Sequence, residues 1–449
     1  MTLNTLLYKD KGPKCTAEPQ IFMIFFAVFI FHQSFTTQNG LGITFMVKSW
    51  PYLLKTLSYI MLIVAAAVLA TNWSAKNLLC LSIAGIGMLH LIQGILDQTV
   101  DAQSEQLDDF FKRLMSIAYG VTHAPVLPCV YVLFARLTSP QDRATVGSYV
   151  FSAKQFSAVL FLVLTTCCAN DNSFLKVYYA TYSIFGLIAL VWSIVYYFVG
   201  SNCDLEFVDQ APSFKPQIPW SSILSSLPVW TLIFSHASSF AVQAVTMNRL
   251  ESIHVSKYVV FLLWVMGGIG SGWLSDALVA QNLLTRLNAR KIFNSLAICV
   301  PMSASIVMFV LEHTSSTLYY NYIVVWTSIK VVLIVLTSFQ SSGFMINHVD
   351  LSPYYAGILI AITEIANQII TGLVILVTNL CANQLRGDSS LIIIQCLLAA
   401  FSIYMGIFFA ICSEAIHQAK SSGLGLAVCN LNCVITLKYC HLKFEPMTV

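Results

Sequence analysis

The stretch Gly267–Ser295, GGIGSGWLSDALVAQNLLTRLNARKIFNS, contains the residues that decide the fold of this chain. It opens as an apolar run dense in glycine, passes through Asp276, and continues as a basic loop before hydrophobic residues resume. Glycines close together in an apolar run let a second helix approach, because no Cβ holds it away. The acid at the helix end faces arginines across a short loop. We therefore expect two membrane helices joined here, with Asp276 and Arg290 forming a charge latch.

The composition of the whole chain places it in a membrane. Of its 449 residues, 57% are hydrophobic and only 10% are charged, whereas soluble globular proteins carry about 25% charged residues. The net charge is only +3 and no long basic tract is present, so no nucleic-acid partner is expected. The 13 cysteines are scattered, most of them in apolar runs, which fits reduced thiols. No nucleophile, metal-ligand or phosphate-loop pattern rises above chance, so we expect neither an enzyme nor a resident metal or cofactor.

Apolar runs long enough to cross a bilayer, about 20 residues each, recur along the chain. They predict an all-α membrane protein with twelve spans: Gln20–Val47, Pro51–Thr71, Leu78–Leu96, Phe111–Ala135, Thr145–Cys168, Leu175–Val199, Trp220–Thr246, Tyr258–Ala280, Ile292–Leu311, Tyr319–Ile346, Tyr354–Leu380 and Leu391–Ile411. The expected organisation is a tail (1–19), a six-helix bundle (20–199), a polar linker (200–219), a second six-helix bundle (220–412) and a second tail (413–449).

The charges of the loops predict the orientation. The side shared with the amino terminus holds Lys76, Arg136, Arg143, Arg286, Arg290 and Lys291, and the other side holds Asp97, Asp101, Glu105, Asp108 and Asp109. Because basic loops stay inside, both termini are expected in the cytoplasm. Two six-helix halves joined by a cytoplasmic linker are typical of parallel-repeat transporters, whose substrate site lies at the midplane between the halves.

Three groups of motifs in the second half support a family resemblance. They are Ile218-Pro219-Trp220 with Pro228-Val229-Trp230, S-G-W-L-S-D (271–276) with R-K-I-F-N-S (290–295), and N-H-V-D-L-S-P (347–353) with Tyr355-Ala356-Gly357. In this order they resemble the sodium/phosphate cotransporter, sialin and vesicular glutamate transporter family of the major facilitator superfamily. The resemblance implies the major facilitator fold and transport of a small anion. The last motif would lie between the tenth and eleventh spans, with Asp350 at the cytoplasmic mouth as a further gate residue beside Asp276 and Arg290, and with Gly357 in a close helix contact.

The first half departs from the pattern of that family. Asn39 is retained in the first span, but Thr37 stands at the family's usual arginine. Ser116 and His123 stand at the usual arginine and glutamate of the fourth span. The loop after the second span, Ala66–Asn77, has lost the family's acid and most of its arginines and glycines. Since the resemblance implies that the arginines bind anionic substrate and the acid carries coupling protons, these four positions are candidates for substrate binding or coupling.

Ionisable residues inside the predicted spans are further candidates, because they are costly there and usually face the bundle interior. His123 could take the coupling role of the absent glutamate, since imidazole titrates near physiological pH; equally, it could be a neutral core histidine bonded to a backbone carbonyl. Glu364 could be a proton or cation site, or the buried partner of Lys330. Lys330 in turn could hold an anion or pair with Glu364, and we favour the pair.

Two functions remain open from the sequence. The first is an ion-coupled transporter of a small organic anion or phosphate working by alternating access, with H+ or Na+ as coupling ion and with His123, Lys330 and Glu364 in coupling and charge recognition. The second is a receptor or scaffold that keeps the fold without transport, which the degraded loop after the second span favours. In either case we expect a monomer in the lipid bilayer of the plasma membrane or of a vesicle or lysosome.

Overall fold

The computed structural model describes residues 17–39, 50–99, 105–168, 174–202, 218–251, 256–314, 322–384 and 388–413. The first half consists of α1 (Ala17–Asn39), α2 (Trp50–Asn72), α3 (Ala75–Thr99), α4 (Glu105–His123), α5 (Val126–Leu137), α6 (Arg143–Phe151), α7 (Ala153–Cys168) and α8 (Phe174–Val199). The second consists of α9 (Trp220–Leu224), α10 (Leu227–Glu251), α11 (Lys257–Ala280), α12 (Arg286–Thr314), α14 (Ile323–Thr337), the 3₁₀ helix η3 (Ser338–Ser341), α15 (Phe344–Leu351), α16 (Ala356–Gln384) and α17 (Asp388–Cys412).

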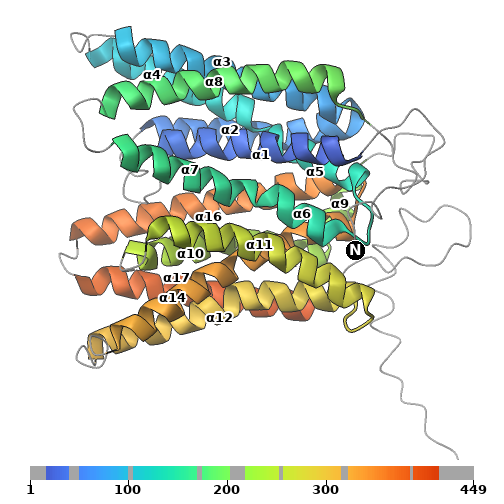
Figure 1. Cartoon of the computed structure of the whole chain (residues 1–449), viewed down its shortest axis with the longest axis vertical. Coiled ribbons are helices and arrows are strands. Elements are labelled where there is room, and N and C mark those ends of the chain that lie inside the picture. The colour runs from blue at the N-terminus through green and yellow to red at the C-terminus, as the bar shows by residue number, and fades with distance from the viewer. Residues whose placement is uncertain are drawn as a thin grey trace, which may run out of the picture.

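The described residues form an all-helical membrane bundle, as predicted. Ten segments, some of them built from two helices, are long and apolar enough to span a bilayer. The long helices α1 and α10 run alongside these ten (Figure 1), an arrangement consistent with twelve spans. Large apolar side chains such as Phe198 and Leu397 face outward, 78% and 65% exposed, which is the surface expected for helices that contact lipid.

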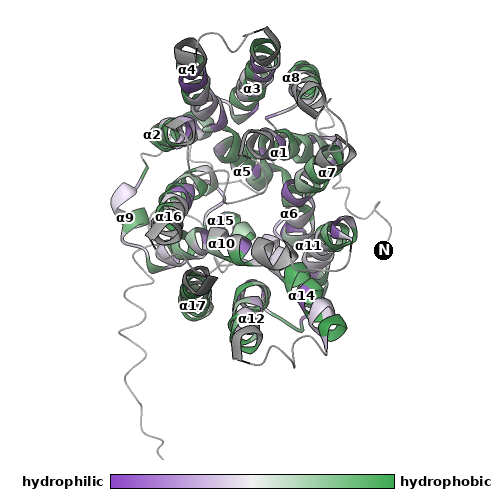
Figure 2. Ribbon diagram, turned by 90° about the vertical axis from the view of Figure 1, so that its left-hand side faces the viewer, coloured by the Kyte–Doolittle hydropathy of each residue, from purple (hydrophilic) through white to green (hydrophobic). Residues whose placement is uncertain are grey.

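The helices are arranged as two packed groups that meet along two pairs of contacts. In the first group α3 packs on α8 and α2 on α4, and in the second α12 packs on α17 and α10 on α16. Seen end-on in Figure 2, the outer helices α3 and α8 lie at one end of the cross-section and α12 and α14 at the other. The groups touch where α11 packs on α6 and α7, and where α16 packs on α2 and α5.

Three spans that the sequence predicted as continuous helices are broken. The span Phe111–Ala135 divides at Ala124 and Pro125 into α4 and α5, because proline has no N–H for the helical ladder. The span Thr145–Cys168 divides at Ser152 into α6 and α7. The predicted span Tyr319–Ile346 contains η3, and a mid-helix 3₁₀ segment often marks a hinge. Broken helices are tolerated in membranes where the freed backbone is buried in protein or lines a cavity.

The end of the tenth span corrects the sequence interpretation. The helix does not end at Ile346, because α15 continues to Leu351 and therefore contains Asn347, His348 and Asp350. All three side chains are buried. The motif is thus the last helical part of a span rather than a loop, and Ser352 ends it in an extended conformation, as expected for a residue before proline.

The glycine-rich stretch of α11 packs as expected at one end and not throughout. Gly272 lies so close to Ser148 and the Ala144 carbonyl of α6 that a Cβ would clash with both. Gly267 lies against Val335 of α14, whereas Gly270 has open space beside it. Gly357 of α16 faces the Pro128 carbonyl, where a Cβ would lie 3.0 Å from the oxygen.

Candidate functional site

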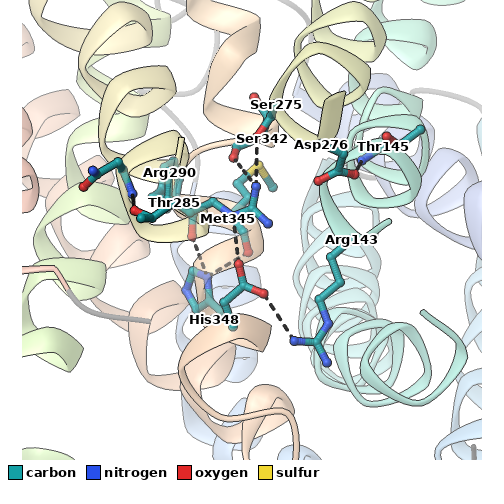
Figure 3. Close-up of polar contacts among 12 residues, drawn as sticks. Arg143, Thr145, Ser275, Asp276, Thr285, Arg290, Ser342, Met345 and His348 are labelled. Atoms are coloured by element: carbon teal, nitrogen blue, oxygen red, sulfur yellow. Dashed lines mark hydrogen bonds and ion pairs between the residues drawn. The ribbon is translucent and has the colours of Figure 1, made fainter. Parts of the chain in front are cut away.

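Asp350 is the centre of a polar contact between the two halves. Its Oδ2 accepts a hydrogen bond from Nε of Arg290 on α12 at 2.8 Å, and its Oδ1 accepts one from Nη1 of Arg143 on α6 at 3.2 Å (Figure 3). Arg290 also donates to the hydroxyl of Ser275 and to the carbonyl of Ser342. The Asp350 and Arg290 side chains are at most 1% exposed, so this is a buried ion triad that joins the first half to the second.

A second polar contact lies beside the triad. The Oδ2 atom of Asp276 on α11 accepts a hydrogen bond from the backbone N–H of Thr145 at 2.7 Å (Figure 3). Thr145 is in the first turn of α6, where N–H groups have no partner within the helix and the helix dipole favours negative charge. We call Arg143, Thr145, Asp276, Arg290 and Asp350 the linker-side cluster, because it lies at the end of the bundle where α8 ends and α9 begins.

The local sequence explains how these groups reach one another. Asn282 adopts the left-handed conformation (φ 59°) that often ends a helix. Thr285 then caps α12, its hydroxyl accepting from the N–H of Asn288 at 3.2 Å, and this places Arg290 one turn inside. On the other half, the Ser139 hydroxyl donates to Asp142 at 2.7 Å in the turn that precedes Arg143.

Asp276 and Arg290 do not form the direct ion pair that was expected, although the Arg290 guanidinium acts electrostatically on the Asp276 carboxylate. The two residues lie in the same cluster, but Arg290 bonds Asp350 and Asp276 bonds the Thr145 backbone. The expectation treated the latch as a contact between neighbouring helices, whereas both acids reach across to the other half of the molecule. Arg143 completes the triad, and the sequence analysis had counted it only as a basic loop residue.

A second polar group, deeper in the bundle, surrounds Glu364 of α16. Its Oε2 lies 3.0 Å from Nε2 of His236 on α10, and its Oε1 accepts from the Gln368 amide at 2.7 Å. The expected partner Lys330 is therefore wrong for Glu364. Nδ1 of His236 lies 3.0 Å from the hydroxyl oxygen of Thr363, and Nε2 of His348 lies 3.0 Å from that same oxygen.

This group connects the interior of the bundle to the linker-side cluster. Glu364, His236, Thr363 and His348 form a continuous chain of polar contacts across α16, α10 and α15, and we call these four residues the central cluster. His348 lies on the same short helix as Asp350. The sequence analysis singled out neither His236 nor Thr363, because nothing in one sequence shows which helices meet.

Three lysines of the membrane spans, Lys55, Lys154 and Lys330, are buried or half-buried. Lys154 of α7 interacts electrostatically with Glu364 of the other half, and so do the hydroxyl groups of Tyr59 and Tyr131. Lys330 is buried in α14. Lys55 of α2 is buried within electrostatic reach of His123.

The remaining candidates of the first half form no comparable group. His123 is buried, and its Nδ1–H donates to the Tyr119 carbonyl at 2.6 Å, which is the contact expected of a core histidine. The hydroxyl of Ser116 bonds the Lys112 carbonyl of its own helix. Thr37 and Asn39 belong to α1, but their side chains lie outside the described residues. The roles of these four residues in binding or coupling remain predictions.

Comparison with solved structures defines the class of the protein. The chain resembles a bacterial homologue of the iron transporter ferroportin (TM-score 0.62, 12% identity, 87% of this chain and 98% of that chain). It also resembles the major facilitator superfamily proton:xylose symporter XylE (TM-score 0.59, 12% identity, 88% of this chain and 96% of that chain). The chain is therefore a multi-pass integral membrane protein with the major facilitator fold.

Comparison with curated proteins shows which transporters the chain is similar to in sequence. No family model matches the chain. It is 23% identical to sialin of Ovis aries over 329 residues, 67% of this chain and 62% of sialin. It is 23% identical to the "Putative inorganic phosphate cotransporter" of Drosophila ananassae over 284 residues, 55% of this chain and 54% of that protein. A third relative is the "Probable vesicular glutamate transporter eat-4" of Caenorhabditis elegans (24% over 314 residues, 62% and 51%).

These relatives confirm the resemblance found in the motifs. The chain is similar to proteins named as a phosphate cotransporter, sialin and a vesicular glutamate transporter, at 23–24% identity. It spans between about half and two thirds of the length of the relatives described above. The names of the two cotransporter and glutamate-transporter relatives describe transporters, which agrees with the expectation that the chain is not an enzyme.

Proposed function

We propose that the protein is a secondary active transporter that moves a small organic anion or phosphate by alternating access, coupled to the movement of an ion. The observation that carries the proposal is the buried polar group around Glu364 in the second half, where His236 and Gln368 hold the carboxylate and Lys154 of the first half lies within its electrostatic reach. Charged side chains are costly to place inside a membrane protein, and those that occur there usually mark a binding site or a transport pathway. The anionic substrates named for the relatives fit a site that offers a cation.

The linker-side cluster gives the proposal a gate. Its contacts join α6 to α11, α12 and α15 and hold the two halves together at one end. Opening that end requires both acids to leave their partners on the other half, and the three broken spans offer places where helices bend. With the orientation expected from the basic loops, this is the cytoplasmic end and both termini are cytoplasmic. The protein would act as a monomer in the plasma membrane or in a vesicle or lysosome membrane.

Uptake into liposomes tests the proposal. Full-length protein is reconstituted with an imposed pH gradient or sodium gradient, and labelled phosphate, glutamate, sugar acids and dicarboxylates are offered. We expect gradient-driven uptake of at least one compound, reduced about tenfold or more in Lys154→Ala, because the variant removes the cation proposed to bind the anion and about 1.4 kcal/mol of lost binding is a tenfold change. Lys154→Arg retains the charge and should retain uptake.

The matched control is Lys257→Gln, which removes a lysine that is exposed at the start of α11 and should leave uptake unchanged. No uptake of any compound by folded wild-type protein would contradict transport and favour the receptor or scaffold function. Uptake that Lys154→Ala leaves intact would contradict the anion site while supporting the class.

A further inference from the structure

We infer that one proton binds between Glu364 and His236, and that Thr363 and His348 transmit its presence to α15, the helix that carries Asp350. The inference rests on the proposed function for its link to anion movement. The proton site and the transmission are argued from the hydrogen-bond geometry of the central cluster.

The direction of each hydrogen bond follows from the end of the chain of contacts. Nδ1 of His348 lies 3.1 Å from the carbonyl oxygens of both Phe344 and Met345. Carbonyl oxygens only accept, so Nδ1 carries the hydrogen. Nε2 of a neutral, fully buried His348 is then an acceptor, and the hydroxyl of Thr363 is the donor beside it. That hydroxyl also lies 3.1 Å from the Ile360 carbonyl of its own helix, but the helical ladder already supplies this carbonyl with a donor, so we assign the Thr363 hydrogen to His348.

The same reasoning determines where the hydrogens lie between His236 and Glu364. Since the Thr363 hydrogen points to His348, its oxygen accepts from Nδ1–H of His236. A neutral His236 with its hydrogen on Nδ1 presents a bare Nε2 to the Glu364 oxygen 3.0 Å away. Two lone pairs at that distance repel one another, so a second proton occupies the contact. Either His236 is an imidazolium beside a carboxylate or Glu364 is protonated, and in both cases the pair is neutral overall.

Loss of that proton reverses the direction of the hydrogen bonds among these residues. One proton leaves the pair for water on the side to which the site is open. His236 then keeps a single hydrogen on Nε2, donates it to the Glu364 carboxylate, and exposes a lone pair at Nδ1. Thr363 now donates to His236 instead of His348. Because the carbonyls of α15 still hold the Nδ1 hydrogen of His348, its buried Nε2 loses its donor, and an unpaired buried acceptor costs about 1–3 kcal/mol.

This asymmetry links the proton to the gate. With the proton bound, His348 is fully bonded and α15 is stabilised in the position that presents Asp350 to Arg143 and Arg290. Without the proton, α15 loses one contact with α16. The charged and titratable groups around the pair are Lys154 of α7, Tyr59 of α2, Tyr131 of α5 and His348 of α15.

Lys154 couples binding of the proton to binding of the anion. When the pair has lost its proton, its net negative charge is compensated by Lys154. An anion that binds Lys154 removes this compensation and favours return of the proton. By linkage, the proton strengthens anion binding by the same factor. The geometry therefore favours movement of anion and proton in the same direction.

The experiment measures the proton and the gate separately in full-length protein in lipid nanodiscs. Infrared difference spectra between about pH 5 and about pH 8, the range in which histidine titrates, report the carboxyl and imidazole bands. Spin labels on non-canonical amino acids at the exposed Gln141 and Gln281 report the distance between the halves at the linker side, since the 13 cysteines preclude ordinary thiol labelling.

We expect a pH-dependent band in the wild type that disappears in Glu364→Gln. Thr363→Val should keep the band, but the distance between the labels should no longer depend on pH. Thr363→Ser retains the hydroxyl and should retain both signals. Thr246→Val is the matched control, because this buried hydroxyl bonds only a carbonyl of its own helix, and it should behave as wild type.

Two results would overturn the inference. The first is a pH-dependent spectrum that Glu364→Gln and His236→Gln leave unchanged, which would place the proton elsewhere. The second is a Thr363→Val protein whose label distance follows pH as in the wild type, which would remove the transmission. If the band and the distance behave as expected while no anion is taken up into liposomes, the proton site stands and the transport proposal fails. Proton-coupled uptake that survives Glu364→Gln would support the transport proposal and contradict the proton site.

Discussion

The two places where the halves meet differ in their chemistry, although each contains the end of the second predicted span of its half. At one place α11 meets α6, and its segment Ser271–Asp276 reads S-G-W-L-S-D; at the other α2 meets α16, and its segment Ala66–Thr71 reads A-A-V-L-A-T. Position by position, Gly272 corresponds to Ala67 and Asp276 corresponds to Thr71. The contact of α11 with α6 has a close glycine and an acid at a helix start, whereas the segment Ala66–Thr71 of α2 has neither.

The second contact is apolar. Ile63 and Ala67 of α2 belong to a buried cluster with Ile358 and Leu359 of α16. The turn after α2 is fastened within its own half, since Asn202 at the start of the linker donates to the Ser74 hydroxyl at 2.9 Å and accepts from the Lys76 N–H at 3.1 Å. We conclude that directional bonds hold the halves together mainly at α6 and α11, while α2 and α16 form a contact that can slide.

The largest loss of stability is expected from a change at Asp350, the one carboxylate of the buried ion triad. Asp350→Asn would leave two buried guanidinium groups without the one carboxylate that both of them bond, and breaking a buried ion pair costs about 3–5 kcal/mol. Thermal unfolding in detergent should show a large loss of stability. The spin-label distance across the linker side should increase.

Asp109→Asn is the control for that prediction. Asp109 pairs with Arg113 on an exposed helix surface, where an ion pair contributes about 0–1 kcal/mol. If Asp350→Asn unfolded at the same temperature as this control, the triad would not be what holds the halves together.

The next largest effect is expected at Gly272, where α11 lies closest to α6. Gly272→Ala places a methyl group against Ser148 and the Ala144 carbonyl, and overpacking of this kind costs about 1–3 kcal/mol. We expect lower stability together with a population in which the linker side is open, both measured as above. Gly270→Ala, on the same helix with open space beside it, should be neutral or slightly stabilising because alanine is the better helix former. Equal losses in both variants would mean that helix propensity, and not the contact, decides the outcome.

The comparison also shows what the sequence could reveal. Hydrophobic spans, basic loops and the motifs near Asp276 and Asp350 were sufficient for the membrane class, the fold and the family resemblance, because each is a local property of the chain. The partners of Asp276, Arg290 and Glu364 were predicted wrongly, because they lie on helices far away in sequence. The break at Pro125 could have been predicted from proline chemistry, whereas η3 follows from packing that no local pattern records.

A smaller effect is expected from the contact between a carboxylate and a helix start. Asp276→Ala removes an acceptor for the Thr145 N–H and should destabilise the closed linker side by about 1–2 kcal/mol. Asp276→Asn retains an acceptor oxygen and loses only the charge, so it should cost about 0.3–1 kcal/mol. The two variants are compared by the fraction of open molecules in the spin-label distance distribution. Identical fractions would mean that the charge, and not the hydrogen bond, makes the contact.

The smallest effect is expected from giving the second contact the acid that it lacks. Thr71 is half-buried near the linker-side end of α2, and its hydroxyl bonds only the Ala67 carbonyl of its own helix. By correspondence with Asp276, Thr71→Asp directs a carboxylate toward the start of α16, where the first N–H groups lack helical partners. A charge there is worth about 0.3–1 kcal/mol and is screened by salt, so the closed fraction should rise slightly and the gain should shrink at high salt. Thr71→Asn is the matched control, since it adds a side chain of similar size without the charge. If both variants close the linker side equally, the correspondence between the two contacts is one of shape alone, and the apolar contact of α2 with α16 cannot be converted into a latch by charge.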